Sequence, residues 1–124
     1  MTLIFIDDDP EDTEVFCEAV NAIDPTIECR TFMNGLDALG SMSAGQVPDI
    51  IFIDINMPKI SGREVLRQIR QQEKFKHIKV VMFSTSLDQA QCDVYRDLGA
   101  DICLKKPNFF RDLVSELRQI LGKY

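Results

Sequence analysis

Two kinds of apolar pattern alternate along this chain, and their order leaves few folds open. Short continuous apolar runs, rich in strand-forming residues, lie at 3–6, 27–32, 50–53, 80–83 and 102–104. Segments with apolar residues at helical spacing separate them, at 10–23, 34–42, 62–72, 88–98 and 108–121. Continuous apolar strands are typical of parallel sheets covered on both faces. The pattern therefore predicts an α/β fold, a (βα)5 chain whose doubly wound, five-stranded parallel sheet carries helices on both sides.

Length and composition are those of one ordinary globular domain. The chain has 124 residues, of which 45% are hydrophobic and 27% are charged. We predict a single domain over residues 1–124 with no output domain attached. No apolar run approaches the ~20 residues that a membrane helix needs, and no basic and apolar leader precedes the first run. We therefore expect a cytoplasmic protein.

The negative charge is concentrated at the start of the chain. The net charge is −6, and the first 14 residues hold six acids and no base, whereas the remainder holds 14 of each. This distribution argues against general nucleic-acid binding, which needs a basic surface. It favours a cation site or a solvated helix start. Asp9 and Pro10 fit the N-cap and first residue of a helix, which leaves Asp7 and Asp8 without that role.

The cysteines do not predict a metal site. Cys17, Cys29, Cys92 and Cys103 form no CxxC pair, and the single His77 adds no second ligand nearby. A zinc site is therefore not expected. In a chain without a leader, we expect free and mostly buried thiols in a reducing compartment.

Polar residues follow four of the five apolar runs. Parallel α/β sheets bind ligands at the C-terminal ends of their strands, and in the common flavodoxin-like order 2-1-3-4-5 the ends of strands 1, 3, 4 and 5 are neighbours. The polar residues at these ends are Asp7, Asp8, Asp9, Asp54, Asn56, Ser84, Thr85, Ser86, Lys105 and Lys106. Each alone has a structural explanation, as a helix-start acid, a turn residue or a loop lysine. Together they predict one polar site.

The chemistry of that site follows from its residue types. Carboxylates in close proximity repel one another unless a cation neutralises them. Oxygen ligands without histidine or cysteine favour Mg²⁺ over zinc. One carboxylate is able to attack phosphorus as a nucleophile, while the metal, a hydroxyl and a lysine hold the phosphoryl oxygens. The glycines are too widely spaced for a nucleotide-binding loop.

Taken with their spacing, these residues resemble the receiver domain of bacterial two-component response regulators, of the chemotaxis-regulator type. The resemblance spans essentially the whole chain. The stretch from Asp54 to Gly62 is its most specific part, and the other matching stretches are 3–9, 49–58, 83–84, 99–100 and 106–107. The family's fold is the predicted 2-1-3-4-5 sheet.

The resemblance implies a phosphoacceptor at Asp54. This residue would take a phosphoryl group from a sensor histidine kinase, a phosphotransfer protein of a phosphorelay, or a small donor such as acetyl phosphate. It also implies that Mg²⁺ is held by Asp7, Asp8, Asp54 and the backbone carbonyl of Asn56. The protein would be a signalling phosphoprotein that catalyses only its own phosphorylation and dephosphorylation.

The resemblance gives two further residues a role at the phosphoryl group. Ser84 would bond one phosphoryl oxygen and Lys106 would pair with another. Thr85 is the alternative hydroxyl if its strand ends one residue later. In relatives the Lys106–Pro107 peptide bond is cis, which would aim the lysine inward.

One position departs from the family pattern. Three residues before Lys106, where relatives carry Tyr or Phe, this chain has Cys103. Because a thiol is smaller than an aromatic ring, we expect either a modified readout or another residue in the switch. The signal itself would pass by phosphorylation-dependent docking of an unknown protein target on the fourth helix, fifth strand and fifth helix, with no direct nucleic-acid or membrane contact.

Two other functions stay open on the residues alone. A small haloacid-dehalogenase-like phosphatase also uses a strand-end aspartate, Mg²⁺, a hydroxyl and a lysine. The first motif of that family, however, has Thr or Val at the position where this chain has Glu11, and here Pro10 precedes that position. A non-phosphorylated interaction module that kept the fold is the second alternative, and the intact acidic pocket counts against it.

Overall fold

The computed structural model describes residues 1–122, so the last two positions of the predicted 1–124 domain lie outside the described residues. Every predicted element is present, with ends that differ from the prediction by at most two residues. The elements are β1 (Thr2–Ile6), α1 (Pro10–Ile23), β2 (Glu28–Phe32), α2 (Gly35–Ser43), β3 (Ile50–Asp54), α3 (Gly62–Gln71), a 3₁₀ turn η1 (Glu73–Phe75), β4 (Lys79–Ser84), α4 (Gln89–Asp97), β5 (Ile102–Lys105) and α5 (Phe110–Leu121).

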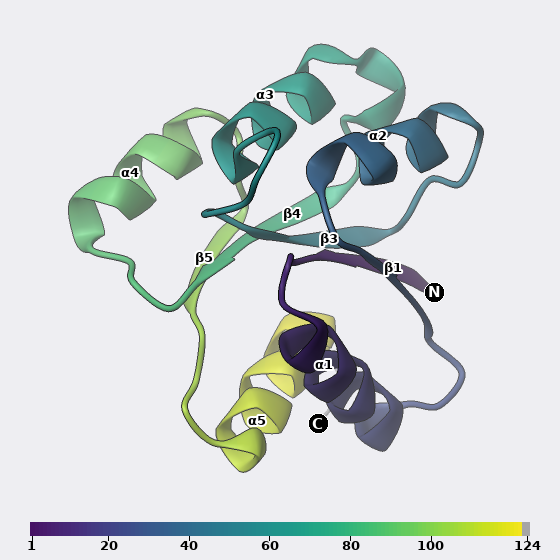
Figure 1. Cartoon of the computed structure of the whole chain (residues 1–124), viewed down its shortest axis with the longest axis vertical. Helices are drawn as coiled ribbons and strands as arrows, with labels where there is room; N and C mark the ends of the chain where they lie inside the picture. Colours follow the sequence, from purple (N-terminus) through teal and green to yellow (C-terminus); the bar gives the residue numbers. More distant parts are fainter. Residues whose placement is uncertain (123–124) are drawn as a thin grey trace.

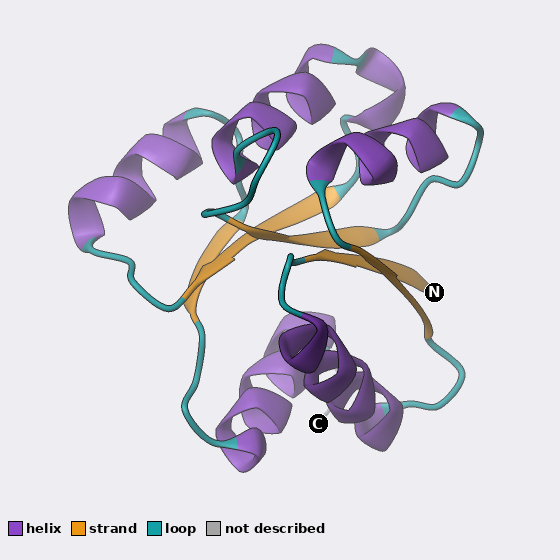
Figure 2. Ribbon diagram, viewed as in Figure 1, coloured by secondary structure: helices purple, strands orange, loops and turns teal. Residues whose placement is uncertain are grey.

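The five strands form one parallel sheet in the order β2-β1-β3-β4-β5, which confirms the predicted fold class. Helices cover both faces: α2, α3 and α4 lie on one side of the sheet, and α1 and α5 lie on the other (Figure 1). Figure 2 shows the resulting three layers, with the strands between the two groups of helices. β1, β3 and β4 are the inner strands, which explains their continuous apolar sequences.

Side-chain alternation along the strands divides the core into two halves. On β3, Ile51 and Ile53 belong to the cluster under α2 and α3, whereas Phe52 belongs to the cluster under α1 and α5. The same alternation places Phe5 of β1 in the second cluster. Because side chains alternate with a period of two, Asp54 and Asp7, two residues further along, continue on the side of α1 and α5.

Local signals set the helix ends near the site. Asp9 is the N-cap of α1 and its carboxylate accepts a hydrogen bond from the Glu11 amide, with Pro10 as the first helical residue, as predicted. Gly99, at φ 110°, follows the end of α4 in the left-handed region that glycine adopts without strain. The first of these caps fixes the direction in which the chain leaves β1.

Two sequence expectations are wrong in detail. The described residues contain no cis peptide bond, so the Lys106–Pro107 bond is trans. The lysine side chain nonetheless points inward, since its Nζ donates to Asp7 and Asp12. The four cysteines are free but half-buried rather than mostly buried. None of the helices among residues 1–122 combines the length and apolar character that crossing a membrane requires.

Candidate functional site

Three carboxylates meet at the C-terminal edge of the sheet. One oxygen from each of Asp7, Asp8 and Asp54 lies within 4.8 Å of the others. Asp7 follows β1 and Asp54 ends β3, and the parallel register pairs Ile6 with Ile53 directly before them. Asp7 and Asp54 are 1% and 7% exposed, whereas Asp8 is open to solvent. The prediction that these three residues come together is confirmed by this geometry.

Lys106 brings a positive charge to the same cluster from the end of β5. Its Nζ lies 2.5 Å from Asp7 Oδ2, 3.0 Å from Asp12 Oδ2 and 3.9 Å from Asp54 Oδ2. The ammonium also lies 5.6 Å from the ring centroid of Phe83, within the range of a cation–π contact. The lysine therefore offsets part of the negative charge and lies within reach of a group bound at Asp54.

Burial and mutual repulsion perturb these carboxylates. Burial raises the pKa of Asp54 to about 6; the Lys106 charge opposes this rise and the neighbouring Asp7 adds to it. Burial likewise raises the pKa of Asp7, against a hydrogen bond from Lys106 that lowers it. Burial alone would lower the pKa of Lys106, but its hydrogen bonds to Asp7 and Asp12 outweigh that effect and raise it. Such opposed shifts are common at functional sites.

The loop after β3 closes tightly over Asp54. The Asn56 amide hydrogen-bonds the Asp54 carboxylate and thereby lowers its pKa. Lys59 adopts φ 66°, and Gly62 donates from its amide to the carbonyl of Ile55 at 3.1 Å. A Cβ on Gly62 would lie 2.5 Å from the backbone oxygen of Asp54. Only glycine permits this approach without movement of the backbone, which explains the Ser61–Gly62 pair.

The structure leaves two candidates, Ser84 and Thr85, for the hydroxyl at the end of β4. β4 ends at Ser84, which is 1% exposed, and its hydroxyl accepts from the Ser86 amide at 3.4 Å. Asp54 pairs in register with Phe83, so the strand alternation places Ser84 on the side of α3 and α4. Thr85 is exposed and lines a cavity of about 260 Å³ together with Lys106. Both hydroxyls thus stand at the right strand end.

Asp12 is the site residue that sequence reasoning missed. It lies in the first turn of α1, where an acid is expected from the helix dipole alone. Its carboxylate nevertheless accepts from Lys106 Nζ at 3.0 Å. The helical turn that separates Asp12 from Asp9 turns its side chain toward the sheet, and helical spacing together with the lysine at the end of β5 was the signal that could have found it.

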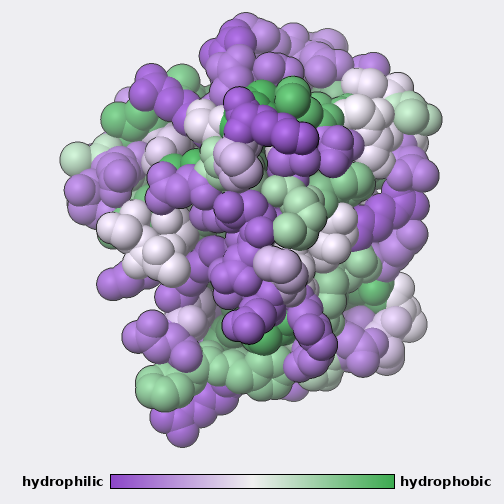
Figure 3. All heavy atoms as spheres, in the orientation of Figure 1, coloured by the Kyte–Doolittle hydropathy of each residue, from purple (hydrophilic) through white to green (hydrophobic). Residues whose placement is uncertain are grey.

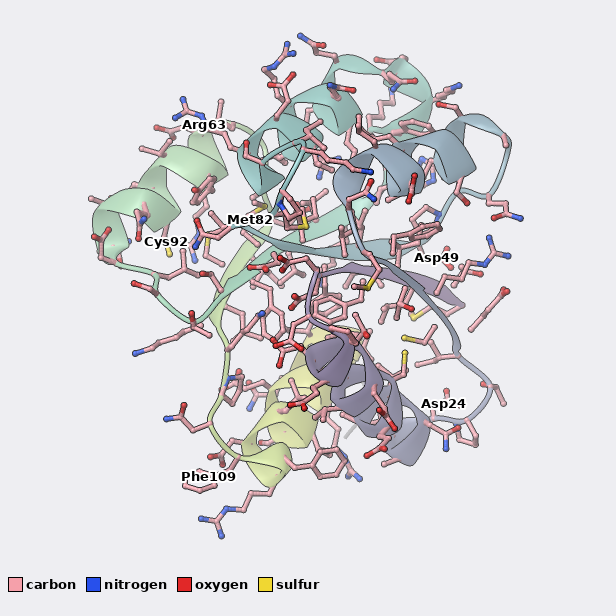
Figure 4. All side chains as sticks on the ribbon, viewed as in Figure 1. Asp24, Asp49, Arg63, Met82, Cys92 and Phe109 are labelled. Atoms are coloured by element: carbon pink, nitrogen blue, oxygen red, sulfur yellow. The ribbon has the colours of Figure 1, made fainter. Side chains whose placement is uncertain are left out.

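An apolar rim borders the site. The cavity beside Lys106 lies between the first turns of α1 and the connection from β5 to α5. Its rim carries Val15, Phe109 and Phe110, which are 41%, 61% and 46% exposed. Figure 4 shows Phe109 at the start of α5, turned away from the body of the protein. Figure 3 shows apolar residues, in pale green, among polar ones along the lower edge of this face.

The donor set fits a hard divalent cation. The described residues offer three carboxylate oxygens within one small volume and no histidine or thiol among them. Such oxygen-only groups suit Mg²⁺ or Mn²⁺. The pKa values of Asp7 and Asp54 are raised mainly by burial, and a bound cation would favour the charged form of both carboxylates.

Comparison with known proteins decides which family has this arrangement. The family model for the response regulator receiver domain matches residues 3–118. The chain belongs to this family. Receiver domains of response regulators accept phosphate from histidine kinases, and this membership favours that role over the phosphatase alternative.

Curated relatives of this receiver domain are bacterial regulatory proteins and response regulators. The transcriptional regulatory protein CpxR homolog of Haemophilus influenzae is 32% identical over 121 residues, which cover 98% of this chain and 50% of that protein. The response regulator Rcp1 of Synechocystis is 27% identical over 124 residues, covering 95% of this chain and 84% of Rcp1. The chain spans about half the length of the first curated relatives it matches.

Solved structures of response regulators share the fold. The Mn²⁺-bound form of Rcp1 superposes with a TM-score of 0.85 at 25% identity, covering 98% of this receiver domain and 91% of that chain. The phosphorylated cyanobacterial phytochrome response regulator RcpA gives a TM-score of 0.86 at 27% identity, over 96% and 89% of the two chains. These neighbours are a metal-bound and a phosphorylated form of the same architecture.

Proposed function

We propose that this receiver domain accepts a phosphoryl group on Asp54 in a reaction that depends on Mg²⁺. The observation that carries the proposal is the convergence of three strand ends. One oxygen of Asp54 lies within 4.8 Å of an oxygen from each of two further carboxylates, and Lys106 Nζ lies 3.9 Å from Asp54 Oδ2. An acceptor oxygen, a cation site and a fixed ammonium are the parts that phosphoryl transfer requires.

In this reaction a carboxylate oxygen of Asp54 attacks the phosphorus of the donor. With a phosphohistidine donor the new O–P bond forms as the N–P bond breaks, and the released imidazole nitrogen takes up a proton. The bound Mg²⁺ would supply positive charge against the phosphoryl oxygens. Asp7, Asp8 and Asp54 would hold it, with the carbonyl of Asn56 as a further ligand.

Lys106 and a hydroxyl complete the proposed site. The Lys106 ammonium, now shared by Asp7 and Asp12, would pair with one phosphoryl oxygen. Ser84 would donate to another after a rotation of its side chain toward the phosphoryl group. Thr85 remains the alternative, since it already faces the cavity beside Lys106.

A protein donor is supported by the surface around the site. Phe109 and Phe110 expose large apolar groups next to the cavity beside Lys106. Exposed aromatic side chains are enriched at sites of protein association. A sensor histidine kinase or a phosphotransfer protein would dock here and present its phosphohistidine to Asp54.

The output side of the proposal rests on α4, β5 and α5. Phosphorylation would shift the population toward an arrangement that binds the group better, and a protein target would read it on this face. Cys103 lies on β5, and its thiol donates to the backbone carbonyl of Cys92 on α4 at 3.8 Å. A small side chain thus lies between the two elements that such a target would contact.

The test is labelling with radioactive acetyl phosphate, with and without Mg²⁺. We expect label only with Mg²⁺, and none in Asp54→Asn. Asp97→Asn, at the exposed end of α4, is the matched control and should label like the native protein. Label that persists in Asp54→Asn places the acceptor elsewhere, and absence of label under conditions that label other receiver domains contradicts the proposal.

A further inference from the structure

Two thiols that take no part in the acidic site meet between α1 and β2. Cys17 Sγ, in the middle of α1, lies 2.9 Å from Cys29 Sγ on β2. Both side chains are half-buried, and both cysteines are free. β2 is an edge strand that pairs only with β1, and α1 packs beside it on the lower side of the sheet (Figure 1).

We propose that Cys17 and Cys29 are a modification site, at which a hydroperoxide converts the two thiols into a reversible disulfide. A disulfide needs its sulfurs ~2.0 Å apart, so a closure of about 0.9 Å from the present 2.9 Å suffices. Such a change is within reach of small side-chain rotations. The two residues lie on packed neighbouring elements, so no part of the fold has to open for the bond to form.

The surroundings give the two sulfurs different roles. Cys17 lines an open hollow of about 460 Å³ that is also bordered by Glu14 and Glu18, so an oxidant reaches Cys17 from solvent. A hydrogen bond with Cys29 lowers the pKa of Cys17, while the same bond raises the pKa of Cys29. Because Cys17 borders the hollow and Cys29 is not among its lining residues, we assign Cys17 as the attacking sulfur and Cys29 as the resolving thiol.

The hollow also selects the oxidant by charge. The carboxylates of Glu14 and Glu18 disfavour an anionic oxidant such as glutathione disulfide. Hydrogen peroxide is small and neutral and is not repelled. The chemical class that the site fits is therefore a small neutral hydroperoxide.

The reaction balances in two steps. The Cys17 thiolate attacks one peroxide oxygen; an S–O bond forms, the O–O bond breaks, and the departing hydroxide takes a proton to become water. The Cys29 sulfur then attacks the sulfenic sulfur of Cys17; the S–S bond forms, the S–O bond breaks, and the second oxygen leaves as water with the Cys29 proton. The two sulfurs together lose two electrons, and the peroxide is reduced to two water molecules.

The first experiment uses the native chain treated with hydrogen peroxide and then with an alkylating agent. A protease that cuts after glutamate separates the two cysteines, because Glu18 and Glu28 lie between them. We expect a peptide containing Cys17 linked to a peptide beginning at Cys29, with a mass about 2 Da below the sum of the reduced peptides. Dithiothreitol should restore both free thiols.

The second experiment separates the two roles in a Cys92→Ser/Cys103→Ser background, which leaves only this pair. With Cys29→Ser added, Cys17 should accumulate sulfenic acid that a cyclic dione traps. With Cys17→Ser added instead, trapping at Cys29 should be roughly tenfold slower. Native protein without peroxide is the reference for both.

Three results would overturn the proposal. The first is a disulfide that forms only between two separate chains. The second is oxidation of Cys17 beyond sulfenic acid while Cys29 can still be alkylated. The third is faster trapping of sulfenic acid at Cys29 than at Cys17. The proposal does not depend on the phosphoacceptor role, so both the native chain and Asp54→Asn should form the linked peptide.

Discussion

Lys106 Nζ lies 2.5 Å from Asp7 Oδ2, although 99 positions separate the two residues in the chain. The contact joins the first and last strands of the sequence across the C-terminal edge of the sheet. Both side chains are largely buried, with 12% and 1% of their surfaces exposed. A buried carboxylate that loses its paired cation carries an uncompensated charge, which is costly.

We therefore predict that Lys106→Met lowers the free energy of unfolding of the metal-free protein by about 3 kcal/mol near neutral pH. Urea denaturation at low salt is the measurement. Lys105→Met is the matched control, because Lys105 is exposed, and it should change stability by less than ~0.5 kcal/mol. Equal stability of Lys106→Met and native protein would mean that the pair contributes nothing net.

Asp54→Asn should have the opposite effect on the metal-free protein. The pKa of Asp54 is raised to about 6 in the folded state, against ~3.9 when unfolded. A carboxyl with a raised pKa favours folding below its unfolded pKa, and this contribution is lost as pH rises through the folded value. The stability advantage of Asp54→Asn should thus be absent near pH ~4, grow to about pH 6 and level off above it, reaching at most about 3 kcal/mol.

Thermal melts across this pH range check the Asp54 prediction. Adding Mg²⁺ should raise the midpoint of the native protein, because an ion that binds only the folded state stabilises it. The rise should be smaller in Asp54→Asn, which has lost one proposed ligand. An advantage of the variant that does not vary with pH would contradict the electrostatic explanation.

Gly62→Ala should destabilise the loop that closes over Asp54. Its Cβ would lie 2.5 Å from the Asp54 carbonyl oxygen and 2.9 Å from Ile55 Cα, so the backbone has to shift. We expect a loss of about 2 kcal/mol and slower labelling of Asp54 by acetyl phosphate. Gly40→Ala is the control: nothing lies within 4 Å of its Cβ position inside α2, and it should stabilise the protein by ~0.5–1 kcal/mol.

Ser84→Ala and Thr85→Ala distinguish the two candidate hydroxyls. If Ser84 donates to the phosphoryl group, its removal should slow labelling by roughly tenfold or more, whereas Thr85→Ala should change the rate by less than about twofold. Time courses of labelling at saturating Mg²⁺ provide both rates. The reverse order would assign the hydroxyl to Thr85 and would agree with its position beside Lys106.

Most of the fold was predictable from the sequence, because its signals are local and repeated. The continuous apolar runs predicted the buried strands, and the Asp9-Pro10 pair predicted the start of α1. The charged stretch around η1 was different: Phe75 is fully buried among charged neighbours, and no periodic pattern marks a three-residue turn.

The site residues whose positions follow from the ends of the strands were predictable from the sequence. The residues whose roles depend on the direction of a side chain were less so. Asp7, Asp8, Asp54 and Lys106 gather because parallel strands end at one edge. Asp12 was missed because its contact with Lys106 joins α1 to the end of β5, so helical spacing had to be combined with the position of a distant lysine. The absence of an output domain, the cytoplasmic location and the roles of single residues stay predictions.

α4 buries only Tyr95 among its nine residues, whereas α3 buries four. A helix with so few buried side chains unfolds locally at a lower free-energy cost than the rest of the fold. Its amide hydrogens should exchange with deuterium sooner than those of α3. Beneath it, Cys103 of β5 contacts α4 through a thiol and not a large ring, so we expect α4 to be the element of this molecule that a small change of charge at the sheet edge repositions.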